Sequence, residues 1–218
     1  SVSVGEFRRR GYLPEALINY LGLLGSSFAG GREILSREEM IEAFSLERAS
    51  KSGAVFDEEK LRWLNAHYIR NLPVDDLMRR LEPFLNQARY EAQAMEPGRL
   101  KMAIESVHDE LTDLSNIGEH IDLFFDGRYE ATPEARQVLA APAAHEVISA
   151  FCEYLDGAEG APSQIYAAAL GHARKKTGLK GRELFMPVRA ALTGRVKGPQ
   201  LDQVFTILGA DTAGKRLR

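Results

Sequence analysis

Apolar side chains recur three or four residues apart along most of this chain. Between residues 14 and 25, for example, the apolar positions include Leu17, Ile18, Leu21 and Leu24. This spacing places apolar side chains on one face of a helix. No stretch of any length alternates strictly between apolar and polar residues, which is the pattern of a half-buried strand. The chain is therefore predicted to be all-α.

Capping residues and breakers mark where the predicted helices begin and end. Ser36 and Glu39 have the spacing of a capping box, and Asp57 precedes a helical pattern as an N-cap. Glycine and proline breakers separate the other segments. One helix is predicted to start after Ser36 and another at Pro199; the remaining predicted helices cover residues 14–25, 58–70, 73–81, 98–111, 116–125, 133–139, 143–155, 162–176 and 184–192.

Length and composition are those of an ordinary globular chain. With 218 residues, 44% of them hydrophobic and 27% charged, the protein can bury a full core. No apolar segment is long enough for a signal peptide, and none reaches the roughly 18 residues that a membrane span needs. We therefore expect a cytoplasmic protein. Because the sequence begins without Met, we also expect a fragment of a longer chain.

Side chains with catalytic potential do not form a recognisable motif. Cys152 is the only cysteine and has apolar and aromatic neighbours, so it is expected to pack as a small apolar side chain rather than to act as a nucleophile. Glu105 and His108 have the spacing used in di-iron bundles, but the sequence lacks a second copy of the pair. It also lacks a glycine-rich phosphate loop and a nucleophile elbow. We expect no catalytic residue and no metal site in this chain.

The formal net charge of −3 hides an uneven distribution of charge. Residues 76–170 contain 7 Lys and Arg against 17 Asp and Glu, whereas residues 171–218 contain 11 against 3. Such segregation favours a basic face that meets phosphate groups. The alternative is a solvated helix face with no ligand.

The basic excess coincides with a predicted helical hairpin near the C-terminus. Its first helix stops at Gly194 and its second begins at Pro199, with Arg195 and Lys197 in the connection. Gly194 and Gly198 leave the backbone accessible. A basic tip with accessible backbone donors and acceptors suits single-stranded RNA.

Three stretches resemble a known family. Residues 180–201 read Lys-Gly-Arg-Glu-Leu-Phe-Met-Pro-Val-Arg-Ala-Ala-Leu-Thr-Gly-Arg-Val-Lys-Gly-Pro-Gln-Leu, and residues 11–25 read Gly-Tyr-Leu-Pro-Glu-Ala-Leu-Ile-Asn-Tyr-Leu-Gly-Leu-Leu-Gly. Both are similar to segments of bacterial glutamyl-tRNA synthetases, as are residues 56–70. The resemblance covers nearly the whole chain and is weakest in residues 76–170.

The resemblance implies the all-helical, tRNA-binding C-terminal part of such an enzyme. Residues 1–72 would be a stem-contact region that follows the missing catalytic domain. Residues 73–218 would be the anticodon-binding domain, with a split into sub-bundles 73–156 and 157–218 as a further option. The parent enzyme would attach glutamate to tRNA with ATP and Mg²⁺, on residues outside this chain. The chain itself would be an inactive monomer that binds tRNA and no cofactor.

The family's functional residues transfer by position. The resemblance implies that Arg189, Gly198, Pro199 and Leu201 contact the anticodon, with Thr193 and Arg195 as neighbours that hold the loop. Lys197 is expected to contribute charge to the same anticodon site. Two alternatives stay open: Arg189 could neutralise a helix end or pair with Glu183, and Leu201 could pack in the core. The residues expected to contact the tRNA stem or its phosphates are Lys51, Ser52, Lys60, Asn65, Arg70, Lys180 and Arg182.

One position departs from the family. Members strict for glutamate tRNA often carry an arginine facing the third anticodon base, at the position that Glu110 occupies here. A carboxylate accepts hydrogen bonds from a base amino group but repels phosphate. The parent enzyme could therefore be relaxed between glutamate and glutamine tRNAs, or could read that base with another residue such as Arg99.

Two other interpretations remain. The chain could be a helical protein-interaction scaffold with no RNA ligand, or a free-standing tRNA-binding protein descended from a synthetase. Salt-sensitive RNA binding would separate the scaffold from the other two, because bound phosphates release counterions.

Overall fold

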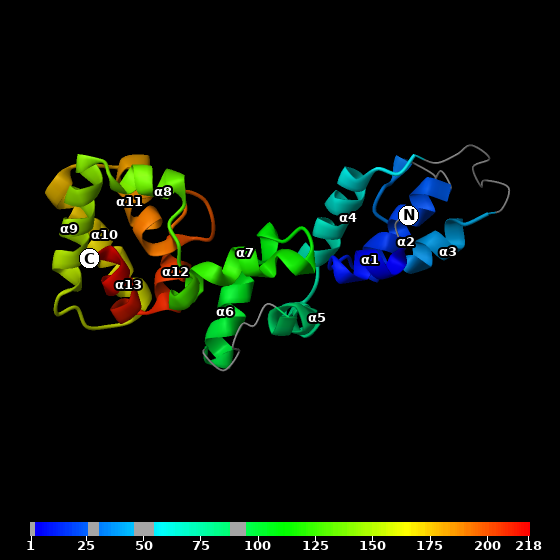
Figure 1. The fold of residues 1–218 in the computed structure, drawn as a ribbon, viewed down its shortest axis with the longest axis horizontal. Helices are drawn as coiled ribbons and strands as arrows, with labels where there is room; N and C mark the ends of the chain where they lie inside the picture. Colours follow the sequence, from blue (N-terminus) through cyan, green and yellow to red (C-terminus); the bar gives the residue numbers. More distant parts are fainter. Residues whose placement is uncertain (1–2, 26–30, 46–54, 88–94) are drawn as a thin grey trace. The chain divides into compact units, whose positions relative to one another are not determined.

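The computed structural model describes residues 3–25, 31–45, 55–87 and 95–218, and in these ranges the chain is helical without a strand. The all-α prediction is confirmed. The chain divides into two compact units (Figure 1). The N-terminal unit comprises Ser1–Ala94 and His108–Glu119, and the C-terminal unit comprises Met95–Val107 and His120–Arg218. None of the described helices combines the length and apolar composition of a membrane span.

The N-terminal unit is built on two long helices, α2 (Pro14–Gly25) and α4 (Glu58–Arg70), which pack on each other. Its other elements are α1 (Val4–Arg9), α3 (Arg37–Ala43), α5 (Val74–Gln87), η3 (His108–Glu110) and η4 (Leu114–Asn116). One core cluster of this unit consists of Phe7, Tyr12, Leu17, Tyr20, Leu61 and Leu64. Both predicted caps are present: Ser36 forms the capping box with Glu39, and the Asp57 carboxylate accepts the Lys60 N–H at 3.0 Å.

The C-terminal unit surrounds α9 (Pro142–Leu155), against which α10 (Pro162–Thr177) and α11 (Arg182–Thr193) pack. The remaining elements are α6 (Pro97–Val107), η5 (Asp122–Phe124), η6 (Asp126–Arg128), α8 (Pro133–Leu139), α12 (Leu201–Leu208) and α13 (Ala210–Leu217). The rings of Phe151, Tyr166 and Phe205 meet in its core, with centroids 5.7 to 6.1 Å apart. This aromatic cluster joins α9, α10 and α12.

The division into units follows packing rather than chain order. Helix α6 packs on α12, whereas η3 returns to α4, so residues of one stretch are shared between the two units. The short helix α7 (Ile117–Ile121) spans the boundary. The sequence predicted a stem-contact region up to residue 72 and an anticodon-binding domain from residue 73. This functional division stays a prediction.

Several helix ends differ from the predictions. Helix α5 continues through Pro83 to Gln87 instead of stopping at Leu81. The helix predicted over residues 98–111 ends at Val107 and continues as the 3-10 turn η3. The segment 116–125 is divided into α7 and η5. Helix α12 begins at Leu201, two residues after Pro199. Apolar spacing predicts a helix but does not distinguish an α-helix from short 3-10 turns.

An ion pair between α2 and α5 is expected to make a pH-dependent contribution to the stability of the fold. Arg80 donates to both carboxylate oxygens of Glu15, at 2.8 and 3.0 Å, and this hydrogen bonding lowers the pKa of Glu15 below its ordinary value of 4.5. The pair therefore stabilises the fold above that value, and the contribution is lost as the pH falls through the lowered pKa.

We expect Glu15→Gln to reduce the free energy of unfolding at pH 7 by up to about 1 kcal/mol, since the pair is partly exposed. The difference from wild type should shrink at pH 3. Urea unfolding at the two pH values measures it, with the exposed Glu82→Gln as the matched control. A deficit of equal size at both pH values would contradict the proposed pairing.

Candidate nucleic-acid interface

The connection between α11 and α12 is the predicted basic loop, residues 194–200, and its first residue is fixed by a close backbone approach. Gly194 has a left-handed φ of 68°, and its N–H donates to Ala190 O at 2.9 Å. A Cβ at this position would lie 2.5 Å from Glu130 O, so only glycine fits. The Thr132 N–H donates to Gly194 O at 2.8 Å. The start of the loop is therefore attached to the segment that precedes α8.

Thr193 supports the same turn from inside. Its side chain is buried, with 1% exposure, and its hydroxyl lies 2.7 Å from Arg189 O. The hydroxyl also accepts the Arg195 N–H at 3.1 Å. Thr193 therefore holds the loop rather than facing a ligand.

Arg189 supports the far end of the loop. Its Nη1 donates to Gly198 O at 3.1 Å and to Pro199 O at 2.9 Å. Gly198 has a φ of 132°, a conformation that favours glycine. Arg189 is half-buried, and its hydrogen bonds shape the backbone at this end of the loop.

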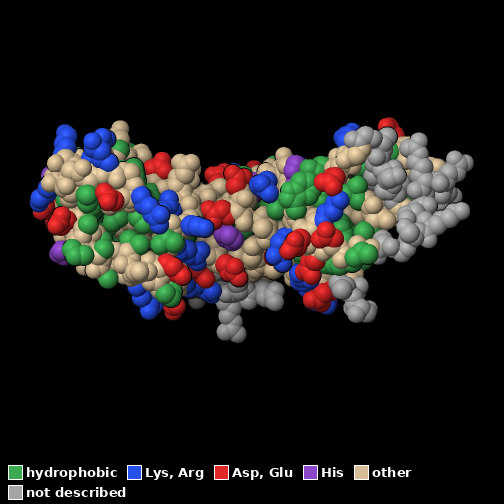
Figure 2. Space-filling model, turned by 90° about the horizontal axis from the view of Figure 1, so that it is seen from above, with side chains coloured by type: hydrophobic (Ala, Val, Ile, Leu, Met, Phe, Trp, Pro, Cys, Tyr) green, Lys and Arg blue, Asp and Glu red, His purple; other side chains and the backbone are tan. Residues whose placement is uncertain are grey.

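The loop presents its charges at the surface. Lys197 is exposed and Arg195 is partly exposed, whereas Pro199 is buried. Leu201 has only 6% exposure, so the core-packing alternative describes its side chain. Within the C-terminal unit, at the left of Figure 2, blue Lys and Arg side chains lie among green apolar ones on the face drawn. The accessible part of the loop consists of residues 195–198 together with Gln200, which lies directly before α12.

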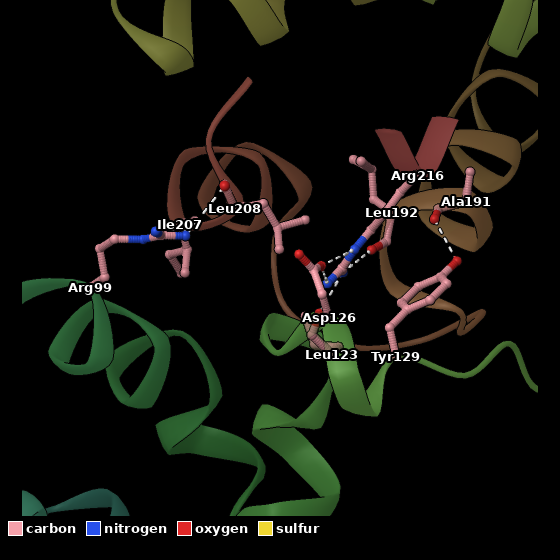
Figure 3. Close-up of polar contacts among 9 residues, drawn as sticks. All are labelled: Arg99, Leu123, Asp126, Tyr129, Ala191, Leu192, Ile207, Leu208 and Arg216. Atoms are coloured by element: carbon pink, nitrogen blue, oxygen red, sulfur yellow. Dashed lines mark hydrogen bonds and ion pairs between the residues drawn. The ribbon is translucent and has the colours of Figure 1, made fainter. Parts of the chain in front are cut away.

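The sequence did not reveal the buried arginine behind this loop. The side chain of Arg216, on α13, is only 6% exposed (Figure 3). Its Nη1 donates to Leu192 O at 2.9 Å and to Leu123 O at 2.5 Å, and its Nη2 donates to Asp126 at 2.7 Å. The guanidinium also lies 4.4 Å from the ring centroid of Tyr129. No local sequence pattern distinguishes Arg216 from exposed cations nearby, because its partners come from distant segments.

Two further polar contacts in Figure 3 complete this framework. The Tyr129 hydroxyl donates to Ala191 O at 2.7 Å, next to the end of α11. Arg99 donates to Ile207 O through Nε at 2.9 Å and through Nη2 at 2.6 Å. Arg99 therefore caps the last turn of α12, a structural role that the sequence did not suggest.

The expected stem and phosphate contacts have different environments. Lys180 and Arg182 are exposed at the start of α11, and Arg70 is exposed at the end of α4. Lys60 pairs with Glu33 at 2.7 Å. Lys51 and Ser52 lie outside the described residues.

Asn65 is a correction to the predicted contacts. Its side chain is fully buried: Oδ1 accepts the Leu13 N–H at 2.8 Å, and Nδ2 donates to Thr112 O at 2.8 Å. Both ends of the amide are occupied inside the protein, so Asn65 clamps α4 to its neighbours and does not contact RNA from this position.

Glu110 lies exposed in η3 and belongs to the N-terminal unit, whereas the loop belongs to the C-terminal unit. The participation of Glu110 in anticodon recognition stays a prediction.

Other reactive side chains have structural environments. Burial raises the pKa of the Cys152 thiol, which disfavours the reactive thiolate. His108 Nε2 lies 2.7 Å from Ile69 O, and because a carbonyl only accepts, this nitrogen must carry the proton. The described part of the chain contains no group of three His, Cys, Asp or Glu side chains placed to hold a metal ion.

The C-terminal unit is thus an all-helical domain with a rigidly supported, basic loop at one helical hairpin. In a comparison with protein families, the model of the anticodon binding domain matches residues 76–218. The chain therefore belongs to this family. Residues 1–63 match the model of the catalytic domain of class I tRNA synthetases for Glu and Gln. The match at residues 1–63 includes most of the region predicted to contact the tRNA stem.

Relatives and solved structures agree with this assignment and confirm the resemblance. The chain is 44% identical over its full length to glutamate–tRNA ligase 2 of Syntrophus aciditrophicus and 38% identical over 99% of its length to glutamate–tRNA ligase of Bacillus subtilis, covering 45% of each protein. A crystal structure of a glutamate tRNA ligase from Elizabethkingia meningosepticum, in complex with its amino acid, matches 97% of this chain with a TM-score of 0.83 at 26% identity, over 41% of that chain. The chain therefore spans less than half the length of the relatives it matches.

The close approach at Gly194 makes a prediction about stability. Gly178 has a similar left-handed conformation at the end of α10, with φ 73°, but no described atom lies within 4 Å of a Cβ built there. We expect Gly178→Ala to cost about 1 to 2 kcal/mol, from backbone conformation alone. Gly194→Ala should cost about 1 to 3 kcal/mol more, because the methyl group overlaps Glu130 O. Equal losses of unfolding free energy in urea titrations would show that the close approach is absent.

Proposed function

We propose that this chain binds tRNA and recognises its anticodon, as the C-terminal part of a glutamate–tRNA ligase. The parent enzyme would attach glutamate to tRNA, using ATP and Mg²⁺ held by residues outside this chain. The observation that carries the proposal is the basic loop 194–200. Hydrogen bonds with Arg189 and Thr193 hold this loop, and it lies in a domain of the anticodon binding family. A monomeric, cytoplasmic protein with glutamate tRNA as its partner fits this proposal.

The geometry supports recognition of unpaired bases. An anticodon loop presents splayed bases whose edges can be read by backbone groups and by charged side chains. The Arg195 N–H and the Gly198 O are used inside the protein, so the backbone groups of Val196 and Lys197 and the Gly198 N–H are the ones offered to bases. Arg195 and Lys197 add positive charge. Because Thr193, Gly194 and Arg189 already hold the loop in shape, binding costs little additional ordering of the backbone.

The other predicted contacts would position the tRNA rather than read it. Exposed Lys180 and Arg182 would contact phosphates near the anticodon, and Arg70 would contact the stem from within residues 1–72. The anticodon-binding part would be residues 73–218. A protein-interaction scaffold and a free-standing tRNA-binding protein remain as alternatives: loss of RNA binding even at low salt would support the former, and the absence of a catalytic half upstream in the reading frame would support the latter.

Equilibrium binding to three RNAs tests the proposal: glutamate tRNA, glutamine tRNA and glutamate tRNA with a scrambled anticodon. We expect wild type to prefer the natural anticodon and to lose affinity as salt rises. Arg189→Ala should weaken binding of the natural tRNA about tenfold or more and remove the preference, since the arginine shapes the loop and supplies charge.

The exposed Lys215→Ala, with the same change in charge on α13, is the control and should keep the preference. Equal wild-type affinity for all three RNAs would refute anticodon recognition and leave only a phosphate contact.

Glu110 is proposed to relax the choice between glutamate and glutamine tRNAs. Replacing it with Arg should raise the affinity ratio in favour of glutamate tRNA, because an arginine donates to a base edge where the carboxylate can only accept. The ratio of the two dissociation constants measures this effect, and the neighbouring exposed Asp109→Arg is the control. An unchanged ratio in Glu110→Arg would remove Glu110 from the recognition site.

A further inference from the structure

A groove between α10 and α11 lies in the C-terminal unit, at the opposite end of α11 from the basic loop. It encloses about 340 Å³, and its lining includes Leu170, Gly171, Arg174, Lys180, Leu184 and Phe185. This volume lies within the range of small-ligand pockets. The lining is therefore mixed: apolar walls, a small residue on α10 and two cations.

The groove has an exposed aromatic wall. Phe185 remains 43% exposed, whereas Leu184 and Val188 on the same helix are buried. An exposed aromatic ring in a concave surface provides a face on which a nucleobase can stack, and such stacking tolerates any base. Leu184, with 2% exposure, closes the groove toward the core.

The groove also has positive charge available. Arg174 and Lys180 are exposed, and neither has an ion-pair partner among the described residues. Nearby Lys176, by contrast, pairs with Glu153. Two unpaired cations beside an exposed ring match the chemistry of a nucleotide, which joins a flat base to a phosphate.

Helix geometry aligns this groove with the basic loop. Phe185 and Arg189 are four residues apart, so they lie on one face of α11 about 6 Å apart along its axis. Arg189 donates to Gly198 O and to Pro199 O, so the face of α11 that carries Phe185 also meets the far end of the loop. One RNA strand that occupies the loop can therefore continue along α11 to the groove.

We propose that the groove between α10 and α11 binds a nucleotide of the tRNA anticodon arm, outside the bases read at the loop. Its base stacks on Phe185, and its phosphate pairs with Arg174 and Lys180. This inference rests on the proposed function, because it needs tRNA as the ligand. Phe185 and Arg174 are thereby assigned to RNA contact, and the phosphate of this nucleotide is the group that Lys180 contacts.

The test uses the full 218-residue chain and an anticodon stem-loop RNA with the glutamate anticodon. Phe185→Leu keeps an apolar side chain but removes the ring, and should weaken binding about tenfold. Phe185→Trp should bind as well as wild type or better. Arg174→Ala should weaken binding more than Lys175→Ala, its exposed neighbour, which changes charge equally but does not line the groove.

Two further measurements separate stacking from loss of fold or charge. Gly171→Phe fills the groove from a position where a Cβ meets no described atom, so it should block RNA while leaving the unfolding midpoint near that of wild type. A series of stem-loop RNAs, each lacking one base of the RNA loop, identifies the stacked nucleotide. Removal of that base should weaken RNA binding by the wild-type protein but not by Phe185→Leu.

The outcomes distinguish this inference from the function on which it rests. If wild type binds no RNA, both fail. If wild type prefers the natural anticodon but Phe185→Leu, Gly171→Phe and Arg174→Ala bind like Lys175→Ala, the groove is not an RNA site, while the proposed function stands.

Discussion

The buried guanidinium of Arg216 is the interaction on which the C-terminal unit depends. A buried charge is costly unless it is paired and hydrogen-bonded, and Arg216 meets this condition with four hydrogen bonds, to Leu123 O, Leu192 O and the Asp126 carboxylate. Because these partners belong to η5, η6 and the end of α11, one side chain of the last helix joins segments far apart in the chain. The end of α11 is the start of the basic loop, so the position of the loop depends on a residue more than twenty positions later.

Several arginines of the C-terminal unit bind backbone carbonyls of the protein itself. This changes how much of the positive charge can be assigned to RNA binding. Arg216, Arg99 and Arg189 each donate to backbone carbonyls at a helix end or in the loop beyond it. Part of the positive excess in residues 171–218 therefore stabilises the protein itself, as the bond of Arg218 to Asp156 also does. The cations left for RNA are fewer than the sum of charges suggests, and those proposed to contact RNA in this segment lie near the end of α10, on α11 and in the two loops that flank α11. Phosphate contact and base reading are thus assigned to different residues of one hairpin.

The sequence predicted local features better than tertiary ones. Helix starts with a capping side chain or a proline, such as α4, α8 and α9, lie at or within one residue of their predicted positions, because caps act within a few residues. The loop and its glycines were also predicted. Asn65 was misjudged because its partners, Leu13 and Thr112, are distant in sequence, and polar side chains look alike before burial is known. Arg216 and the groove beside Phe185 were missed for the same reason.

Residues 195–198 are proposed to form the surface that meets the anticodon. Hydrogen exchange of the backbone amides, with and without glutamate tRNA, tests this proposal most directly. We expect tRNA to slow exchange at residues 195–198 and to leave helix α9 unaffected, and we expect a tRNA with a scrambled anticodon to protect the loop much less. If saturating tRNA leaves exchange at these four amides unchanged, residues 195–198 are not the anticodon-binding surface.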